Sequence, residues 1–155
     1  MNTVSDHALL ASYLATDWLI QTADGILTVR AGSAAPAALR PSGIVTAFNP
    51  ASRPRDEDEN RRDDAELRGR IAVRSLTAFR TLARGTGADA AAWDEPGWCV
   101  PGDVRAAVVA LGAEFGQNAI VWIDPAGEVT LVCTRDGFCG AGVGEVLEGE
   151  LAAAG

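Results

Sequence analysis

The chain has 155 residues, the size of a single domain, and its apolar content of 48% is typical of a folded protein rather than a disordered one. The formal net charge of −8 disfavours nonspecific binding to nucleic acid or to anionic membranes, because both attract surfaces rich in Lys and Arg. All 13 basic residues are arginine, which excludes reactions that need a lysine, such as Schiff-base formation.

The sequence shows no targeting signal and no metal motif. No apolar run approaches the roughly 18 residues needed to cross a bilayer, and no basic stretch precedes an apolar one at the N-terminus. We therefore expect a cytoplasmic protein. Cys99, Cys133 and Cys139 lack CxxC spacing and there is a single His, so the pattern predicts free thiols, no metal site and no cofactor. A disulfide between Cys133 and Cys139 stays open as an alternative.

The first half of the chain predicts a short helix, a hairpin, a central strand and a long charged helix. Ser5 is a good N-cap for the first helix, and a turn at 23–25 joins two apolar segments. The run 43–48 is apolar on both faces, which is typical of a strand in the middle of a sheet. The expected elements are a helix at 7–14, strands at 17–22, 26–30 and 44–48, and a helix at 56–72.

The long helix predicts a polar residue on its core-facing side. Asp56 and Glu59 have the spacing of a capping box. Leu67 and Ile71, four residues apart, form the apolar stripe of this helix. Extending the stripe backwards at helical spacing reaches Asn60, which we therefore expect to face the core.

The second half of the chain predicts strands around one more helix. Segment 76–82 is compatible with a helix or a strand, and its alternating pattern favours a strand. Asp103 is expected to cap the next helix and Gly116 to end it. The expected elements are strands at 76–82 and 98–100, a helix at 104–114, a hairpin of strands at 119–123 and 129–134, and a weak helix at 145–154, with irregular segments at 85–96 and 137–144.

This order of elements predicts a single domain over residues 1–155 with an α+β fold. Hairpins near both ends imply a mixed or antiparallel sheet. The two main helices carry one apolar stripe each, so we expect a two-layer sandwich in which both helices pack on one face of the sheet.

Four short blocks resemble a known bacterial family. The blocks are 46–52, 59–60, 95–98 and 115–120. In this order and spacing the chain resembles the family called domain of unknown function 3293, over about residues 10–134, and leaves an irregular tail at 135–155. The resemblance implies a small cytoplasmic bacterial domain to which no activity is assigned.

Polar side chains beside apolar segments form the candidate site. Asn49 ends the apolar run 43–48, and Gln117 and Asn118 precede the apolar strand at 119–123. A buried amide costs about 1–3 kcal/mol when unpaired, so these side chains either cap backbone groups at the ends of elements or line a ligand site. Both interpretations stay open. The candidate ligand-binding residues are Asn49, Ser52, Asn60, Glu95, Gln117 and Asn118, with no catalytic and no metal-binding residue assigned.

Two main hypotheses for function follow from these residues. The first is a non-enzymatic binding or interaction module for a small polar ligand or a protein partner, because neither Ser52 nor Cys99 has the surroundings of a nucleophile. The second is a small hydrolase in which Glu95 is the general base and the amides position the substrate. A third and weaker option is nucleic-acid recognition through Arg53–Arg62 and Trp98, which the acidic residues of the same helix disfavour.

Overall fold

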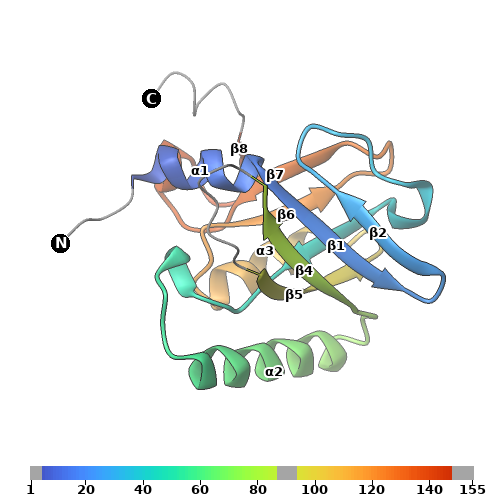
Figure 1. Cartoon of the computed structure of the whole chain (residues 1–155), viewed down its shortest axis with the longest axis horizontal. Coiled ribbons are helices and arrows are strands. Elements are labelled where there is room, and N and C mark those ends of the chain that lie inside the picture. The colour runs from blue at the N-terminus through green and yellow to red at the C-terminus, as the bar shows by residue number, and fades with distance from the viewer. Residues whose placement is uncertain (1–4, 87–93, 148–155) are drawn as a thin grey trace.

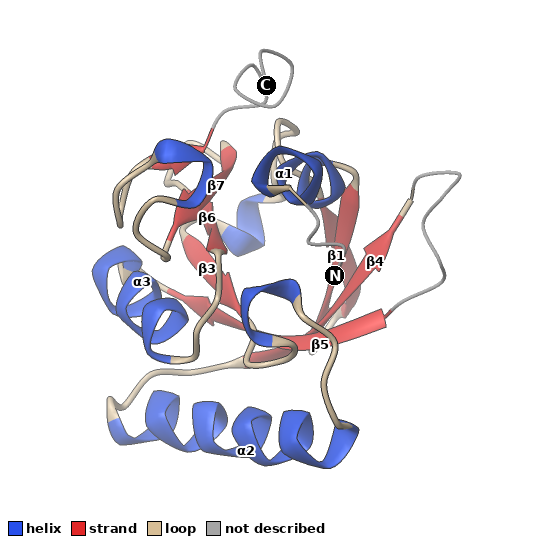
Figure 2. Cartoon of the chain, turned by 90° about the vertical axis from the view of Figure 1, so that its left-hand side faces the viewer, coloured by secondary structure: helices blue, strands red, loops and turns tan. Residues whose placement is uncertain are grey.

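The computed structural model of the chain describes residues 5–86 and 94–147. Within these ranges, eight strands form one antiparallel sheet in the order β2-β1-β4-β5-β3-β6-β7-β8. The sheet is a strongly curled half-barrel, and the helices α1, α2 and α3 lie around it (Figures 1 and 2). The α+β class and the antiparallel alternative are confirmed. Instead of the expected two-layer sandwich the sheet forms a half-barrel, because the accumulated twist curls it until its inner face surrounds a second core.

The N-terminal elements follow the prediction closely. In α1 (Asp6–Leu14) the Ser5 Oγ accepts a hydrogen bond from the Ala8 amide at 3.1 Å. Strands β1 (Thr16–Thr22) and β2 (Gly25–Val29) form the expected hairpin. Strand β3 (Ser42–Val45) lies between β5 and β6, as its apolar faces predict, but ends before Phe48. It ends early because the Thr46 hydroxyl donates to the Pro96 carbonyl at 2.7 Å and accepts the Phe48 amide at 3.0 Å.

Both main helices form, but neither is capped as predicted. In α2 (Glu57–Val73), Asn60 is buried together with Leu67 and Ile71, so its core-facing position is confirmed. Asp56 makes no capping hydrogen bond, and the capping box is wrong; three acidic residues in the first turn face the positive end of the helix dipole instead. In α3 (Arg105–Glu114) the N-cap is Val104 rather than Asp103, because the Val104 amide donates to the Gly102 carbonyl and shifts the boundary.

Two strands differ from the prediction in ways that affect the site. Strand β4 (Phe79–Gly85) confirms the strand reading of 76–82. Strand β5 (Asp94–Pro101) begins four residues before the predicted strand start at Trp98, so Glu95 lies in the sheet rather than in the predicted loop. Strands β6 (Ala119–Ile123) and β7 (Val129–Cys133) form the expected hairpin.

The C-terminal prediction of a weak helix at 145–154 is wrong for its described part. Val146 and Leu147 form β8, which pairs with β7, and Leu147 is buried. Pairing with an exposed strand edge and burying Leu147 outweigh the weak helical preference of this segment. The rest of that predicted helix lies outside the described residues.

The curled sheet separates two apolar cores. On its convex side, α2 and α3 pack on the same face, as predicted, against outward-facing residues that include Val100, Ile120 and Trp122. On its concave side, α1 covers inward-facing residues that include Trp18, Ile44 and Leu131. Because side chains alternate along a strand, β3, β5, β6 and β7 contribute to both cores, whereas β1, β2, β4 and β8 contribute to the concave one. Figure 2 shows α1 across the open side of the curl and α2 outside it.

Two absences hold for residues 5–86 and 94–147. No helix there is long and apolar enough to cross a membrane, and no group of three His, Cys, Asp or Glu residues is placed to hold a metal ion. Cys99, Cys133 and Cys139 are free thiols, as predicted, so the Cys133–Cys139 disulfide does not form in this structure.

Candidate functional site

The main cavity of the described chain lies between α1 and the concave face of the sheet. Its volume is about 360 Å³. One side is apolar and is formed by inward-facing residues of the sheet and by Leu9 of α1. The other side is polar and combines side chains that are far apart in the sequence. The polar residues of the lining are Ser12, Tyr13, Thr16, Thr46, Asn49, Ser52, Thr81, Glu95, Gln117 and Asn118.

Side chains alternate between the two faces of a strand, and Glu95 lies two residues before Gly97 on β5. Both residues therefore face the cavity and line it. Burial raises the pKa of Glu95 to about 7, although a hydrogen bond from the Asn49 side chain lowers it. The carboxyl group therefore changes charge near neutral pH. Gly97 itself is required by close packing, because a β-carbon there would lie 2.8 Å from the Val45 carbonyl oxygen and 2.9 Å from the Thr81 hydroxyl.

Asn49 is oriented by Asn60 behind it. The Asn60 Oδ1 accepts a hydrogen bond from the backbone N–H of Asn49 at 2.8 Å, and the Asn60 Nδ2 donates to the side-chain Oδ1 of Asn49 at 2.8 Å. The Asn49 Oδ1 also accepts the backbone N–H of Arg55. With its oxygen occupied, Asn49 turns its Nδ2 towards Glu95. Asn60 does not line the cavity. It positions a residue that does.

Arg55 locks the same arrangement from the other side. Its Nε donates to the Asn60 Oδ1 at 2.7 Å, and its Nη2 pairs with Asp63 at 2.7 Å and with the Ala47 carbonyl at 3.1 Å. The guanidinium of Arg55 is thus occupied by contacts with other groups of the protein. Arg55 was not among the predicted site residues, and its sequence context among many compensating charges gave no signal that would select it.

A second hydrogen-bonded chain enters the cavity from the C-terminal part of the fold. The Arg135 Nε donates to the Asn118 Oδ1 at 2.6 Å, which fixes the amide so that its Nδ2 donates to the Tyr13 hydroxyl at 2.9 Å. The Tyr13 hydroxyl is also hydrogen-bonded to the Ser52 hydroxyl. Burial raises the pKa of Tyr13. One proton lies between the two hydroxyl groups, so the other is free to donate into the cavity.

Gln117 closes the polar side of the cavity. Its Nε2 donates to the carbonyl oxygens of Phe48 and Phe115, at 3.2 and 3.3 Å. Its backbone carbonyl accepts the Thr134 hydroxyl at 2.6 Å. The Gln117 Oε1 receives no hydrogen bond from the described residues, which leaves an acceptor at the cavity wall.

The turn that carries Asn49 and Ser52 has an uncommon backbone. Asn49, Ala51 and Ser52 all have positive φ angles, of 45°, 56° and 58°. Left-handed backbone costs about 1 kcal/mol or more for a residue with a β-carbon, so the contacts of Asn60, Gly116 and Tyr13 with this turn offset real strain. The turn lies below α1 in Figure 1, in teal, and brings Ser52 to the cavity.

The structure brings the predicted site residues together. Asn49, Ser52, Glu95, Gln117 and Asn118 line one cavity, and Asn60 binds Asn49 directly. The prediction missed Tyr13, Thr81 and Arg135. Tyr13 lies on the predicted amphipathic helix, where the pattern indicates that an aromatic side chain packs in the hydrophobic core. Arg135 follows the last predicted strand without any motif.

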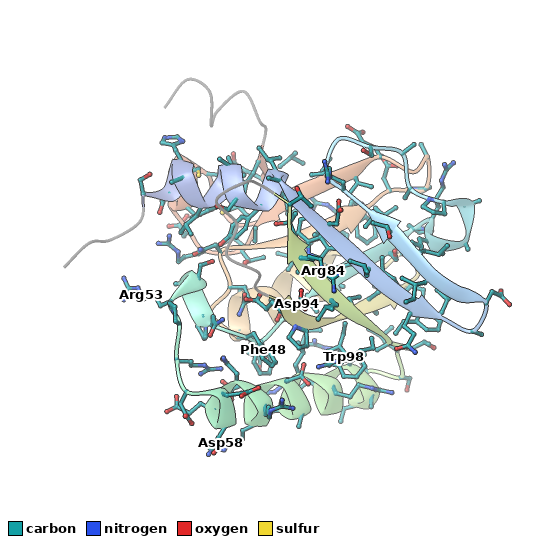
Figure 3. The ribbon with its side chains drawn as sticks, in the orientation of Figure 1. Phe48, Arg53, Asp58, Arg84, Asp94 and Trp98 are labelled. Atoms are coloured by element: carbon teal, nitrogen blue, oxygen red, sulfur yellow. The ribbon has the colours of Figure 1, made fainter. Side chains whose placement is uncertain are left out.

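No arginine of the segment Arg53–Arg62 lines the cavity, although Pro54 of the same segment does. The guanidinium of Arg80 lies 4.4 Å from the ring centroid of Trp98, and that of Arg68 lies 5.4 Å from it. In Figure 3 the Trp98 side chain points towards α2, whereas Arg53 points outwards. Arg84 and Asp94 form an exposed ion pair across β4 and β5, visible in the same view. Nucleic-acid recognition through Arg53–Arg62 and Trp98 stays a prediction.

Fold and cavity together define a small α+β protein with a curled antiparallel sheet and, under its first helix, a cavity with one apolar and one polar side. Residues 45–120 match the family described as "Protein of unknown function (DUF3293)". This segment of the chain is therefore similar to that family. The match is narrower than the expected 10–134, yet it contains all six predicted site residues and excludes Tyr13 and Arg135. No curated protein and no solved structure matches the chain.

Proposed function

We propose that this domain is a non-enzymatic binding module whose cavity holds a small molecule with an apolar body and a polar head. The observation that carries the proposal is the two-sided lining: an apolar floor from the sheet and α1, and a polar wall with Glu95 at its centre. Cavities with mostly apolar linings and a few converging polar groups are the usual sites for small ligands. The volume of about 360 Å³ suits a small molecule better than a protein segment.

Binding of benzyl alcohol, a small probe with an apolar ring and a neutral polar head, tests the proposal. We expect amide chemical-shift changes centred on α1, β4 and β5. Ala83→Leu, which adds bulk to the apolar floor, should weaken binding about tenfold or more because the added atoms occupy the cavity. Ala65→Leu, on the exposed face of α2, is the matched control and should leave binding unchanged. Shift changes elsewhere, or equal binding by both variants, would contradict the proposal.

A second candidate is the hydrolase hypothesis, which one observation favours. A carboxyl group with a pKa of about 7 is suited to general acid–base catalysis at neutral pH, and the Ser52 hydroxyl lines the same cavity. If this function holds, turnover of nitrophenyl esters should fall about 100-fold or more in Glu95→Gln. Hydrolysis that Glu95→Gln leaves unchanged would rule out this role of Glu95.

A further inference from the structure

Several side-chain donors of the polar wall of the cavity are already bonded to groups of the protein. Among the amide groups, Gln117 donates to two backbone carbonyls, Asn118 donates to Tyr13, and Asn49 donates to Glu95. Among the hydroxyl groups, those of Ser12, Thr16 and Thr46 donate to backbone carbonyls. The Thr81 hydroxyl and one of the Tyr13 and Ser52 hydroxyls keep a proton, so these free donors are neutral hydroxyl groups.

The acceptors that stay available are the carboxyl oxygens of Glu95 and the Gln117 Oε1. Both residues line the cavity. No Arg or His is among its lining residues in the described chain, so nothing there would neutralise an anionic head group. A ligand head that fits this wall brings hydrogen-bond donors and a positive charge.

We propose that the cavity is selective for a cationic amine attached to an apolar body, with Glu95 as the counter-ion and Gln117 as a second acceptor. The inference deepens the proposed function and rests on it. An ammonium group has three donors and no acceptor, which matches an acceptor-rich wall. The apolar floor, with Trp18 and Ile44, would pack against the body of the ligand.

The charged groups around Glu95 leave it free to take this role. Arg55 is bound to Asp63, and Arg84 on the adjoining strand β4 is bound to Asp94. Arg135, which faces Tyr13, is bound to Asp6 and Asn118. Tyr13 is the other titratable side chain of the lining, and burial raises its pKa, so it stays neutral. Within residues 5–86 and 94–147, the carboxyl of Glu95 is therefore not paired with a cation.

Binding of a cation requires Glu95 in its charged form, so the affinity should depend on pH. Glu95 has a pKa of about 7 in the free protein. At about pH 8 the Glu95 side chain is a carboxylate and can pair with the amine directly. At about pH 5.5 Glu95 is protonated and must lose its proton before it can pair with the amine. Amine affinity should then fall by about tenfold or more between these two values, since each pH unit below the pKa costs up to about tenfold.

Three probes with the same ring and different heads test the inference: benzylamine, benzyl alcohol and benzoate, each titrated by amide chemical shifts at both pH values. At about pH 8 we expect benzylamine to bind about tenfold more tightly than benzyl alcohol, and benzoate to bind most weakly. In Glu95→Gln, benzylamine should lose its pH dependence and should bind no more tightly than benzyl alcohol does to the same variant.

The outcomes distinguish a failure of the cationic specificity from a failure of the proposed small-molecule binding. If benzyl alcohol binds in the cavity but benzylamine is no tighter, or benzoate is tighter, the cationic specificity is wrong and the binding proposal stands. If Glu95→Gln keeps the amine preference, Glu95 is not the counter-ion and the inference is overturned. If none of the three probes shifts the cavity residues at millimolar concentration, both proposals fail.

Discussion

Glu95→Gln should make the protein more stable at about pH 8, by up to about 3 kcal/mol, and should change its stability little at about pH 5. The reason is the cost of a buried charge. The folded protein raises the pKa of Glu95 from 4.5 to about 7 because burial disfavours the carboxylate. Glutamine has a similar shape, keeps an oxygen for the Asn49 amide, and stays neutral at every pH.

The sign follows from proton binding. Between pH 4.5 and about 7 the folded protein holds the Glu95 proton more tightly than the unfolded chain does. Its stability therefore falls as the pH rises through this interval, and the loss is complete above the folded pKa. Urea unfolding at the two pH values measures the effect. Glu128→Gln, at an exposed carboxylate, is the control and should change stability by less than about 0.5 kcal/mol at both.

A Glu95→Gln variant that is no more stable than the wild type at about pH 8 would show that the carboxylate is well solvated. The acid–base argument would then lose its basis, and so would the pH-dependent part of amine binding. A direct titration of the Glu95 carboxyl by NMR provides an independent check, with an expected midpoint of about 7.

Asn60→Ala should destabilise the protein by about 3 kcal/mol or more, a large effect for a polar residue on a charged helix. The substitution removes three hydrogen bonds at once: it leaves the Asn49 backbone N–H and the Arg55 Nε without their partner and takes one of two donors from the Asn49 Oδ1. Unpaired buried polar groups cost about 1–3 kcal/mol each. The strained turn at 49–52 would also lose the contact that holds its first residue.

Two further measurements make this prediction specific. Arg62→Ala, on the exposed face of α2, should cost less than about 0.5 kcal/mol in urea unfolding. In Asn60→Ala the pKa of Glu95 should rise further, because a free Asn49 no longer presents a donor to the carboxylate. A loss of stability without any change in that pKa would mean that Asn60 supports the fold but does not orient Asn49.

Local patterns predicted most of the elements because their signals lie within a few neighbouring residues. Ser5 caps α1 through a contact three residues away, and the apolar stripe of α2 is visible as Leu67 and Ile71 at helical spacing. The same periodicity placed Asn60 on the buried side of that helix. Where the prediction failed, as at β5 and β8, the deciding contacts came from a neighbouring strand rather than from the segment itself.

The sequence by itself determined the α+β class, the acidic and lysine-free surface, and a set of polar residues at the ends of apolar segments. The tertiary structure alone decided that these residues meet. The Asn118 amide donates to Tyr13 across 105 residues of sequence, and Glu95 enters the cavity because β5 starts early and the sheet curls around it. Curvature and long-range pairing arise from contacts summed over the whole sheet, so no local pattern contains them.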